Sequence, residues 1–258
     1  MNNKLFSQFL RFPRLPQFPQ LFLMITVVAA LTFAGCRVKD KDKGDPPTLP
    51  PAETMQIDFS NFILTAKSAK GAEDNNWTTA AEIVSPWRTL AADIPVTAYK
   101  GAANQKANHV SGAKWEWSQS GTRLTGETTG SQVKWEMFVS DVKRLDGTSN
   151  TDATEGKWTL YEGQTALLQV DWKKTGTKIE PVKYTYTKDG NNKGAYIECG
   201  SMSGSYDFYY SVRYYNATLG KFSEARIEWN NASKAGRIRS ADYLNGEWKE
   251  WDGQKMDK

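Results

Sequence analysis

The stretch Ser205-Tyr-Asp-Phe-Tyr-Tyr-Ser-Val-Arg-Tyr-Tyr215 alternates between two kinds of side chain. Every second residue is aromatic or aliphatic, in the set Tyr206, Phe208, Tyr210, Val212 and Tyr214. The residues between them are Asp207, Tyr209, Ser211, Arg213 and Tyr215. Successive side chains of a β-strand point to opposite faces, so this stretch predicts a strand with its first set in a core.

The same two-residue period recurs through the C-terminal half of the chain. Apolar and polar residues alternate at residues 133–139, 168–172, 182–186 and 225–229. This pattern is typical of antiparallel strands with one face in water. Short turn-forming stretches separate the runs, and Asn245-Gly246 is the strongest hairpin signal because both residues tolerate positive φ.

Strands joined by short turns lie beside one another, so the predicted fold class is mainly β. We expect a strongly curved antiparallel meander sheet or a barrel of about ten strands, since a flat open sheet of that size is unusual. Met55-Gln-Ile-Asp-Phe59 alternates as well and predicts the first strand. Asp141 to Glu155 reads as one long polar connection.

Residues 78–106 carry the only helical signal that we find. Apolar residues follow a helical spacing from Thr78 to Asp93, and Pro86 inside this run predicts a break or a kink. Pro95 is placed to begin a second short helix that runs to about Lys106. One or two helices should therefore pack against the concave side of the sheet or across one end.

The N-terminal segment has the organisation of an export signal. Its first 20 residues are polar and basic, and an apolar run of 15 residues, 21–35, follows and ends in small residues. That run is short for a permanent membrane helix. A membrane helix to about residue 35 and an ordinary signal peptide remain the alternatives.

Phe33-Ala34-Gly35-Cys36 resembles the lipobox of bacterial lipoprotein precursors, although Phe33 stands where that family favours Leu. The resemblance implies cleavage after Gly35 and diacylglyceryl and acyl (palmitate) groups on Cys36, which together give stable anchoring to membrane lipid. Arg37, rather than Asp, follows the cysteine, which implies the outer membrane of the cell envelope, on either its periplasmic or its surface face.

Three segments follow from this interpretation. Residues 1–35 are the signal peptide, residues 36–54 are the lipidated cysteine and a disordered charged and proline-rich tether, and residues 55–258 form a single β-rich domain. The Trp-x-Trp and Gly-x-Trp strands of this domain are similar to those of uncharacterised β-rich outer-membrane lipoproteins, a family with no known activity.

Composition excludes several function classes. The net formal charge is +4, but without Lys4, Arg11 and Arg14 the 33 basic residues fall to 30 against 29 acidic ones. A mature domain this close to neutral gives no support for nucleic-acid binding. The two cysteines, Cys36 and Cys199, leave no internal disulfide once Cys36 is lipidated, and Cys199 lies in an apolar run that predicts a buried, inert thiol.

No catalytic signature is present. His109 is the only histidine and lies in an expected loop, and a zinc site needs more Cys or His ligands than the chain has. Three aspartates between residues 141 and 152 (Asp141, Asp146, Asp152) lack the spacing of a calcium loop. Three strand glutamates, which we interpret as solvated, are the remaining candidates for paired-carboxylate hydrolysis: Glu116, Glu136 and Glu228. We expect no cofactor and no metal.

The aromatic face of residues 205–215 provides the candidate ligand site. Tyr209, Arg213 and Tyr215 mix rings with a cation, a combination that stacks on sugars or holds amphipathic ligands. Cross-strand pairing within the sheet explains the same residues without a ligand. The sequence therefore favours a non-enzymatic binding or carrier module for an apolar ligand or a glycan, with an envelope-complex subunit and a polysaccharide hydrolase as alternatives.

Overall fold

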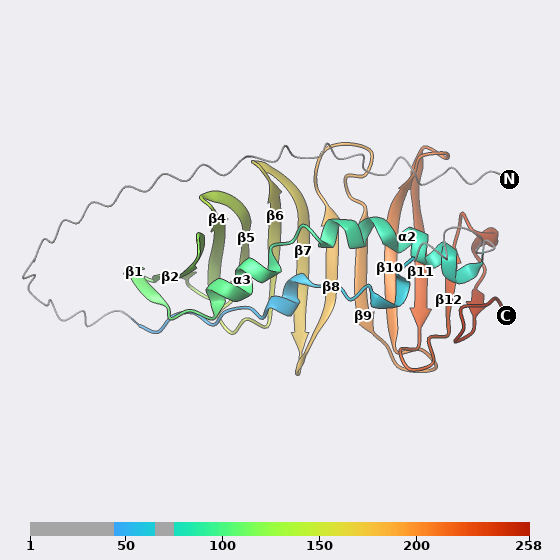
Figure 1. The fold of residues 1–258 in the computed structure, drawn as a ribbon, viewed down its shortest axis with the longest axis horizontal. Coiled ribbons are helices and arrows are strands. Elements are labelled where there is room, and N and C mark those ends of the chain that lie inside the picture. Colours follow the sequence, from blue (N-terminus) through green and yellow to red (C-terminus); the bar gives the residue numbers. More distant parts are fainter. Residues whose placement is uncertain (1–43, 65–74) are drawn as a thin grey trace, which may run out of the picture.

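The computed structural model describes residues 44–64 and 75–258. Thirteen strands form one antiparallel sheet in chain order, and each strand pairs with the next (Figure 1). The meander is confirmed, but the expected number of about ten strands is too low, and the sheet does not close, because β1 and β13 are its two edges. The strands are β1 (Asn108–Ser111), β2 (Lys114–Gln119), β3 (Thr122–Thr129), β4 (Gln132–Val139), β5 (Val142–Asn150), β6 (Glu155–Glu162), β7 (Thr165–Thr175), β8 (Lys178–Tyr186), β9 (Tyr196–Ser201), β10 (Phe208–Asn216), β11 (Lys221–Trp229), β12 (Gly236–Ser240) and β13 (Lys249–Trp251).

Alternation places most of the buried apolar residues of these strands on one face, which we call the covered face. One buried row crosses the sheet from β2 to β7, with its members opposite one another in register: Trp117, Leu124, Met137, Leu145, Leu160 and Leu168. Other buried positions of the covered face on later strands are tyrosines and aliphatic residues, and Tyr184, Tyr210 and Ile227 among them are fully buried. Burial of these side chains supplies the main stabilising term of the fold.

Tryptophans on the covered face lie over glycines of the neighbouring strand. Trp135 is opposite both Gly126 and Gly147, and Trp158 is also opposite Gly147. A Cβ atom at Gly126 would lie 2.5 Å from Cζ3 of Trp135. The missing side chains leave room for the indole rings, which explains why glycine stands inside several strands despite its low strand propensity.

Strand β5 corrects the long polar connection expected at residues 141–155. Its inward positions are Leu145, Gly147 and Ser149, and only the first of these is an apolar side chain. Gly147 makes room for indole rings, and the hydroxyl of Ser149 accepts a hydrogen bond from Nε1 of Trp135 at 2.9 Å. Two of the three inward residues thus make room for, or bond to, neighbouring tryptophans. The sequence of this strand therefore lacks the apolar alternation that predicts a strand.

Two α-helices cross the covered face: α2 (Asn76–Ala91) and α3 (Val96–Ala103). Helix α2 contacts β10, β12 and β13, whereas α3 contacts β2 and β3 (Figure 1). Asn75 caps α2 by accepting a 2.8 Å hydrogen bond from the backbone N–H of Thr78. Of the break or kink expected at Pro86, the break does not occur, because α2 runs through that residue as a single helix.

The segment that precedes α2 also packs on the covered face. It contains two 3₁₀ turns, η1 (Ala52–Met55) and η2 (Ser60–Phe62), and η1 contacts β7 and β8. The strand expected at residues 55–59 is wrong, since these residues pair with no strand. Met55, Ile57 and Phe59 are nevertheless buried, so the alternation reported burial correctly.

Tyrosine hydroxyls hold this segment in place of a neighbouring strand. Oη of Tyr184 accepts from the Ile57 N–H at 3.0 Å and donates to the Met55 carbonyl at 2.7 Å. The hydroxyl of Tyr99 donates to the Pro50 carbonyl at 2.5 Å, and that of Tyr210 donates to the Asp58 carbonyl. The packed part of the chain therefore begins by residue 50, ahead of the domain boundary expected at residue 55.

At the other end of the chain, Asn245 and Gly246 both adopt positive φ, as their hairpin signal predicted. They do not form a two-residue turn between strands. They belong to η3 (Leu244–Gly246) within the longer connection from β12 to β13.

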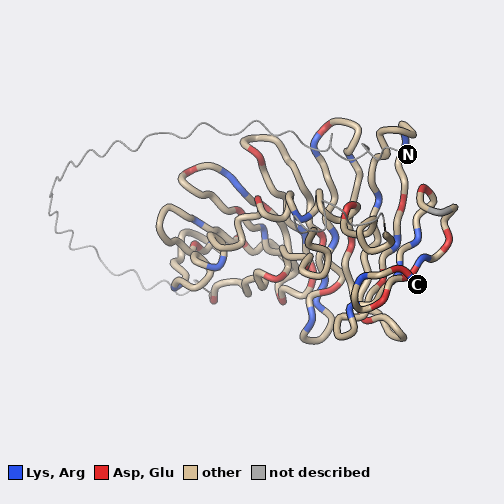
Figure 2. The backbone as a smooth tube through the Cα atoms, turned by 45° about the vertical axis from the view of Figure 1, so that its right-hand side comes forward, with Lys and Arg blue, Asp and Glu red and all other residues tan. Residues whose placement is uncertain are grey.

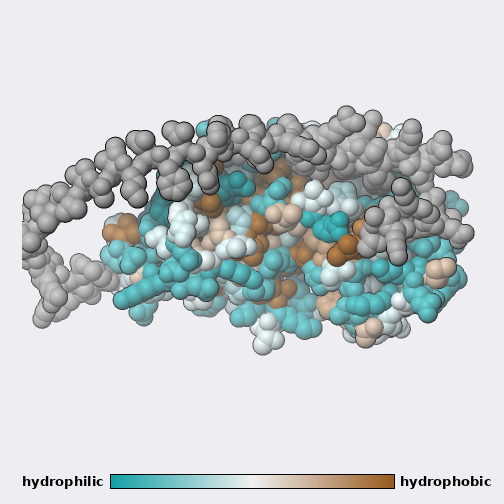
Figure 3. Space-filling view, viewed as in Figure 1, coloured by the Kyte–Doolittle hydropathy of each residue, from teal (hydrophilic) through white to brown (hydrophobic). Residues whose placement is uncertain are grey.

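Seen from the helix side, hydrophobic residues show as small separate areas among hydrophilic ones where the described part of the chain is visible (Figure 3).

Cys36 and the expected signal peptide lie outside the described residues. In the ranges 44–64 and 75–258, no helix has both the length and the apolarity to cross a membrane.

Candidate functional site: the open face of the sheet

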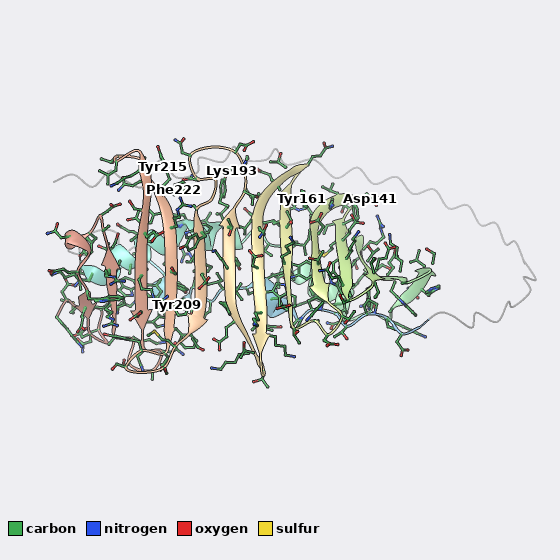
Figure 4. The ribbon with its side chains drawn as sticks, turned by 180° about the vertical axis from the view of Figure 1, so that it is seen from behind. Asp141, Tyr161, Lys193, Tyr209, Tyr215 and Phe222 are labelled. Carbon is green, nitrogen blue, oxygen red and sulfur yellow. The ribbon has the colours of Figure 1, made fainter. Side chains whose placement is uncertain are left out.

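The second face of the sheet, which we call the open face, carries the polar members of each alternation (Figure 4). Its side chains also stand in register from strand to strand. One row follows the order Lys114, Glu127, Lys134, Thr148, Lys157, Asp171, Lys183 and Glu198 across β2 to β9. Lys and Arg are interspersed with Asp and Glu over the molecule instead of gathering in a patch of one sign (Figure 2). Opposite charges in neighbouring strands stabilise such a surface modestly.

Aromatic rings of the open face lie beneath cations. A Lys or Arg lies within 5 Å of the ring centroid in pairs that include Phe138–Arg123, Tyr161–Lys143, Tyr196–Lys183, Tyr209–Arg226, Phe222–Arg213 and Trp248–Arg237. Each ring attracts its cation through the negative π face. The rings therefore fix the cations in place, and the face offers positioned hydrogen-bond donors to a ligand rather than bare aromatic surface.

The candidate ligand residues Tyr209, Arg213 and Tyr215 all lie on the open face of β10, but they do not converge on one point. Arg213 lies 4.0 Å from the ring centroid of Phe222, and Tyr215 meets the same ring edge-on at 5.8 Å. Tyr209 is at the opposite end of the strand (Figure 4). The structure thus brings two of the three together and adds Phe222 to them.

Tyr209 belongs to a separate cluster. Its ring lies 3.6 Å from Cζ of Arg226, and its hydroxyl donates a 2.9 Å hydrogen bond to Oε1 of Glu198. Burial, and then the bond to this carboxylate, raise the pKa of Tyr209 to about 12. The phenol therefore stays protonated and remains a donor at neutral pH.

Glu228 is the anionic centre of this cluster, and sequence reasoning placed it wrongly among solvated charges. Only 5% of the residue is exposed. Its two carboxylate oxygens meet Nε of Arg226 at 3.1 Å and Nη2 of Arg237 at 2.6 Å. A buried carboxylate needs such partners, because an unpaired charge in this position costs several kcal/mol, on the order of 3–5. Glu228 therefore has a structural role, because both of its carboxylate oxygens are paired with arginines.

A groove of about 410 Å³ lies on the open face over β2 to β6. Its polar lining consists of three lysines, three threonines and three carboxylates: Lys114, Lys134, Lys157, Thr125, Thr148, Thr159, Glu127, Glu136 and Asp146. The backbone at Gly147 also lines it. The lining is neutral in total formal charge and mixes donors with acceptors at close spacing.

Lys143 and Tyr161 fix the carboxylate of Asp146 at the edge of this groove. Nζ of Lys143 lies 2.6 Å from Oδ2 of Asp146, and Oη of Tyr161 donates to the same oxygen at 2.9 Å. Burial, followed by the hydrogen bond to Asp146, raises the pKa of Tyr161. The groove therefore has at least one carboxylate that is held in a defined position, as recognition of a ligand requires.

Of the residues considered for catalysis, Glu136 lines the groove directly opposite Asp146 on the neighbouring strand. Among residues 44–64 and 75–258, no three His, Cys, Asp or Glu side chains form a group that could hold a metal. Asp141 and Asp152 lie beyond opposite ends of β5. Glu136 is 3.5 Å from Nζ of Lys143, and His109, expected in a loop, lies on β1 with Nε2 2.9 Å from the Gly112 carbonyl. The lining is suited to holding a ligand by hydrogen bonds.

Cys199 lies on β9, half-buried against the core, and makes no disulfide within the described residues. Burial, and then the carboxylates of Asp58, Glu180 and Glu198, raise the pKa of its thiol to about 12.

We expect native Cys199 to react with iodoacetamide at pH 8 at least about 100-fold more slowly than in urea, since the thiolate is the nucleophile. Mass spectrometry of the Cys199 peptide measures this ratio. Equal rates in the two solvents would contradict the buried position.

In comparisons with known proteins, no family model, no curated protein and no solved structure matches the chain.

Proposed function

We propose that the protein is a lipid-anchored binding module of the bacterial outer membrane, and that the groove on its open face binds a glycan. The anchor rests on the sequence, in which an apolar run ends at Phe33-Ala34-Gly35-Cys36. Two or more acyl chains on Cys36 give stable attachment. Intact mass measurement of protein extracted from its host tests the anchor. A chain that begins at Met1, or an unmodified Cys36 thiol, would contradict it.

The difference between the two faces carries the proposal for the ligand. Apart from a cavity at its β13 end, the covered face is filled by the chain's own residues, with Met55, Leu124 and the helix residue Val84 completely buried. A lipid-sized ligand would have to displace this packing. The groove on the open face, in contrast, combines hydroxyl, ammonium and carboxylate groups. Sugar hydroxyls both donate and accept hydrogen bonds, so a mixed lining of this kind complements them.

A permanent subunit interface is less well supported. Obligate interfaces bury contiguous apolar surface. The exposed large hydrophobic residues lie apart on separate elements and connections: Ile63, Val110, Val142, Leu219 and Met256. The open face has no apolar patch of the required kind among the described residues, which favours a polar ligand over an obligate protein partner.

A tryptophan at Thr159 should block the groove. Thr159 lines it, whereas Thr185 on β8 is equally half-buried and lies in the same cross-strand row, outside the groove. On an array of bacterial envelope polysaccharides, we expect Thr159→Trp to lose binding about tenfold or more, because a bulky ring excludes the ligand. Thr185→Trp is the matched control and should bind as the parent does. The absence of any glycan bound by the parent protein, or an equal loss in both variants, would contradict the proposal.

A further inference from the structure

A second cavity, of about 380 Å³, lies at the β13 end of the covered side. Four of its eight lining residues are aromatic: Phe62 of η2, Trp77 of α2, Trp229 of β11 and Trp251 of β13. Phe62 meets Trp229 edge-on at 5.1 Å and Trp251 edge-on at 6.2 Å. These contacts hold the rings in fixed orientations around the cavity. Elements far apart in the sequence thus build a rigid aromatic slot.

One polar atom of this wall has no partner. The indole N–H of Trp77 donates to the Asn61 carbonyl at 3.2 Å, and that of Trp251 donates to the Lys234 carbonyl at 3.0 Å. The indole N–H of Trp229 is buried and makes no hydrogen bond with any described residue. Trp229 itself is only 4% exposed. A buried donor without an acceptor is costly, and Nε1 of Trp172 is in the same state elsewhere on the sheet.

Two lysines also line the cavity. Nζ of Lys255 lies 3.7 Å from the ring centroid of Trp77, and Nζ of Lys234 donates to Oδ1 of Asn61 at 2.8 Å and to Oδ1 of Asn231 at 3.1 Å. Within the described part of the chain neither lysine forms a salt bridge, whereas six other lysines do. The two ammonium groups thus share one site, and neither is paired with a carboxylate of the described residues.

The electrostatics of Lys255 agree with this arrangement. Burial, and then the charge of Lys234, lower the pKa of Lys255. Like charges in a partly dry site repel each other, and an anion bound between them would remove that repulsion. The cavity therefore combines an aromatic wall, which suits the apolar part of a ligand, with two lysines that suit an anionic group.

We propose that this cavity binds a small organic anion with a planar apolar body, of the aromatic carboxylate class. The carboxylate lies between Lys234 and Lys255, and the ring enters among Phe62, Trp229 and Trp251. Planar rings of this kind pack edge-on or offset against tryptophan, and charge-assisted hydrogen bonds fix the anionic end. The site is separate from the groove on the open face and does not depend on the glycan proposal.

Titration calorimetry of the purified protein with 1-naphthoate and with 1-naphthamide tests the proposal. The two probes share a shape and differ in charge. We expect naphthoate to bind about tenfold or more tightly than naphthamide, since each ammonium–carboxylate bond exists only for the acid. The variants Lys234→Met and Lys255→Met should each lose most of this preference. Undetectable binding of naphthoate to the parent, or equal affinity for acid and amide, overturns the proposal.

Two control variants show whether the anion binds in this cavity or elsewhere on the protein. Lys249→Met removes a lysine of β13 that pairs with Glu247 at 3.8 Å and does not line the cavity, so it should keep the preference for naphthoate. Thr159→Trp blocks the groove on the open face and should also keep it. A preference for naphthoate that survives in both Lys234→Met and Lys255→Met, or that disappears in Lys249→Met, places the anion elsewhere and overturns the proposal. Thermal unfolding of each variant shows that the fold is retained.

Discussion

Replacing Gly147 with valine should unfold the protein. Gly147 lies in the middle of β5 with Trp135 on one side and Trp158 on the other. A Cβ atom there would lie 2.6 Å from Cε3 of Trp158 and would also press on the Lys157 carbonyl. Both tryptophans are 1% exposed, so neither can move aside without disturbing the core. We expect a loss of about 4 kcal/mol or more, a large part of the typical free energy of unfolding.

Urea unfolding followed by circular dichroism measures this loss, and Gly101→Ala is the matched control. Gly101 lies within α3, and an added Cβ would meet only the flexible end of the Gln119 side chain. Alanine in a helix interior is favoured over glycine, so this variant should gain about 0.5–1 kcal/mol. A Gly147→Val protein within about 1 kcal/mol of the parent would show that the tryptophans do not fill the space beside this glycine.

Removing one hydroxyl at Tyr184 should release the N-terminal segment from the sheet. Oη of Tyr184 is hydrogen-bonded to both the Ile57 N–H and the Met55 carbonyl, and Tyr184 is completely buried. In Tyr184→Phe, two buried backbone groups lose their partner, at about 1–3 kcal/mol each. We therefore expect a loss of about 2–5 kcal/mol in the free energy of unfolding.

Hydrogen exchange distinguishes this local release from general loosening of the sheet. The amide of Ile57 should lose protection in Tyr184→Phe while the amides of β4 and β5 keep theirs. Tyr186→Phe is the control on the same strand and face, since its hydroxyl makes no hydrogen bond with any described residue, and it should cost less than about 0.5 kcal/mol. Equal stabilities of the two variants would mean that Tyr184 does not hold the segment.

The sequence predicted the strands because a two-residue period arises wherever one face of a strand is buried. The short turns between the strands then predicted the meander. The prediction failed where residues are buried without pairing in the sheet, and where a paired strand contributes little apolar surface. Residues 55–59 alternate because they lie on the sheet, yet tyrosine hydroxyls rather than a strand satisfy their backbone. Strand β5 was missed for the opposite reason, since Gly147 and Ser149 make room for, or bond to, tryptophans instead of contributing apolar surface. A search for glycine opposite tryptophan would have found it.

The candidate sites were less predictable than the fold. Alternation placed Tyr209, Arg213 and Tyr215 correctly on one face, but it could not show that Arg226 and Phe222 join them from β11. Glu228 was misread because local pattern cannot reveal two arginines that bury it. The aromatic cavity is built from residues of η2, α2, β11 and β13, and only the tertiary fold brings these together.

The central claim is that the chain itself closes one face of the sheet, apart from the cavity at its β13 end, whereas the other face is free to bind. Hydroxyl-radical footprinting of the purified protein tests this claim most directly, because aromatic side chains oxidise only where solvent reaches them. The account predicts oxidation at Tyr161, Tyr215 and Phe222 on the open face, with Trp158 and Tyr184 unmodified. Oxidation of Trp158 and Tyr184 at rates similar to those of the open-face residues would contradict it.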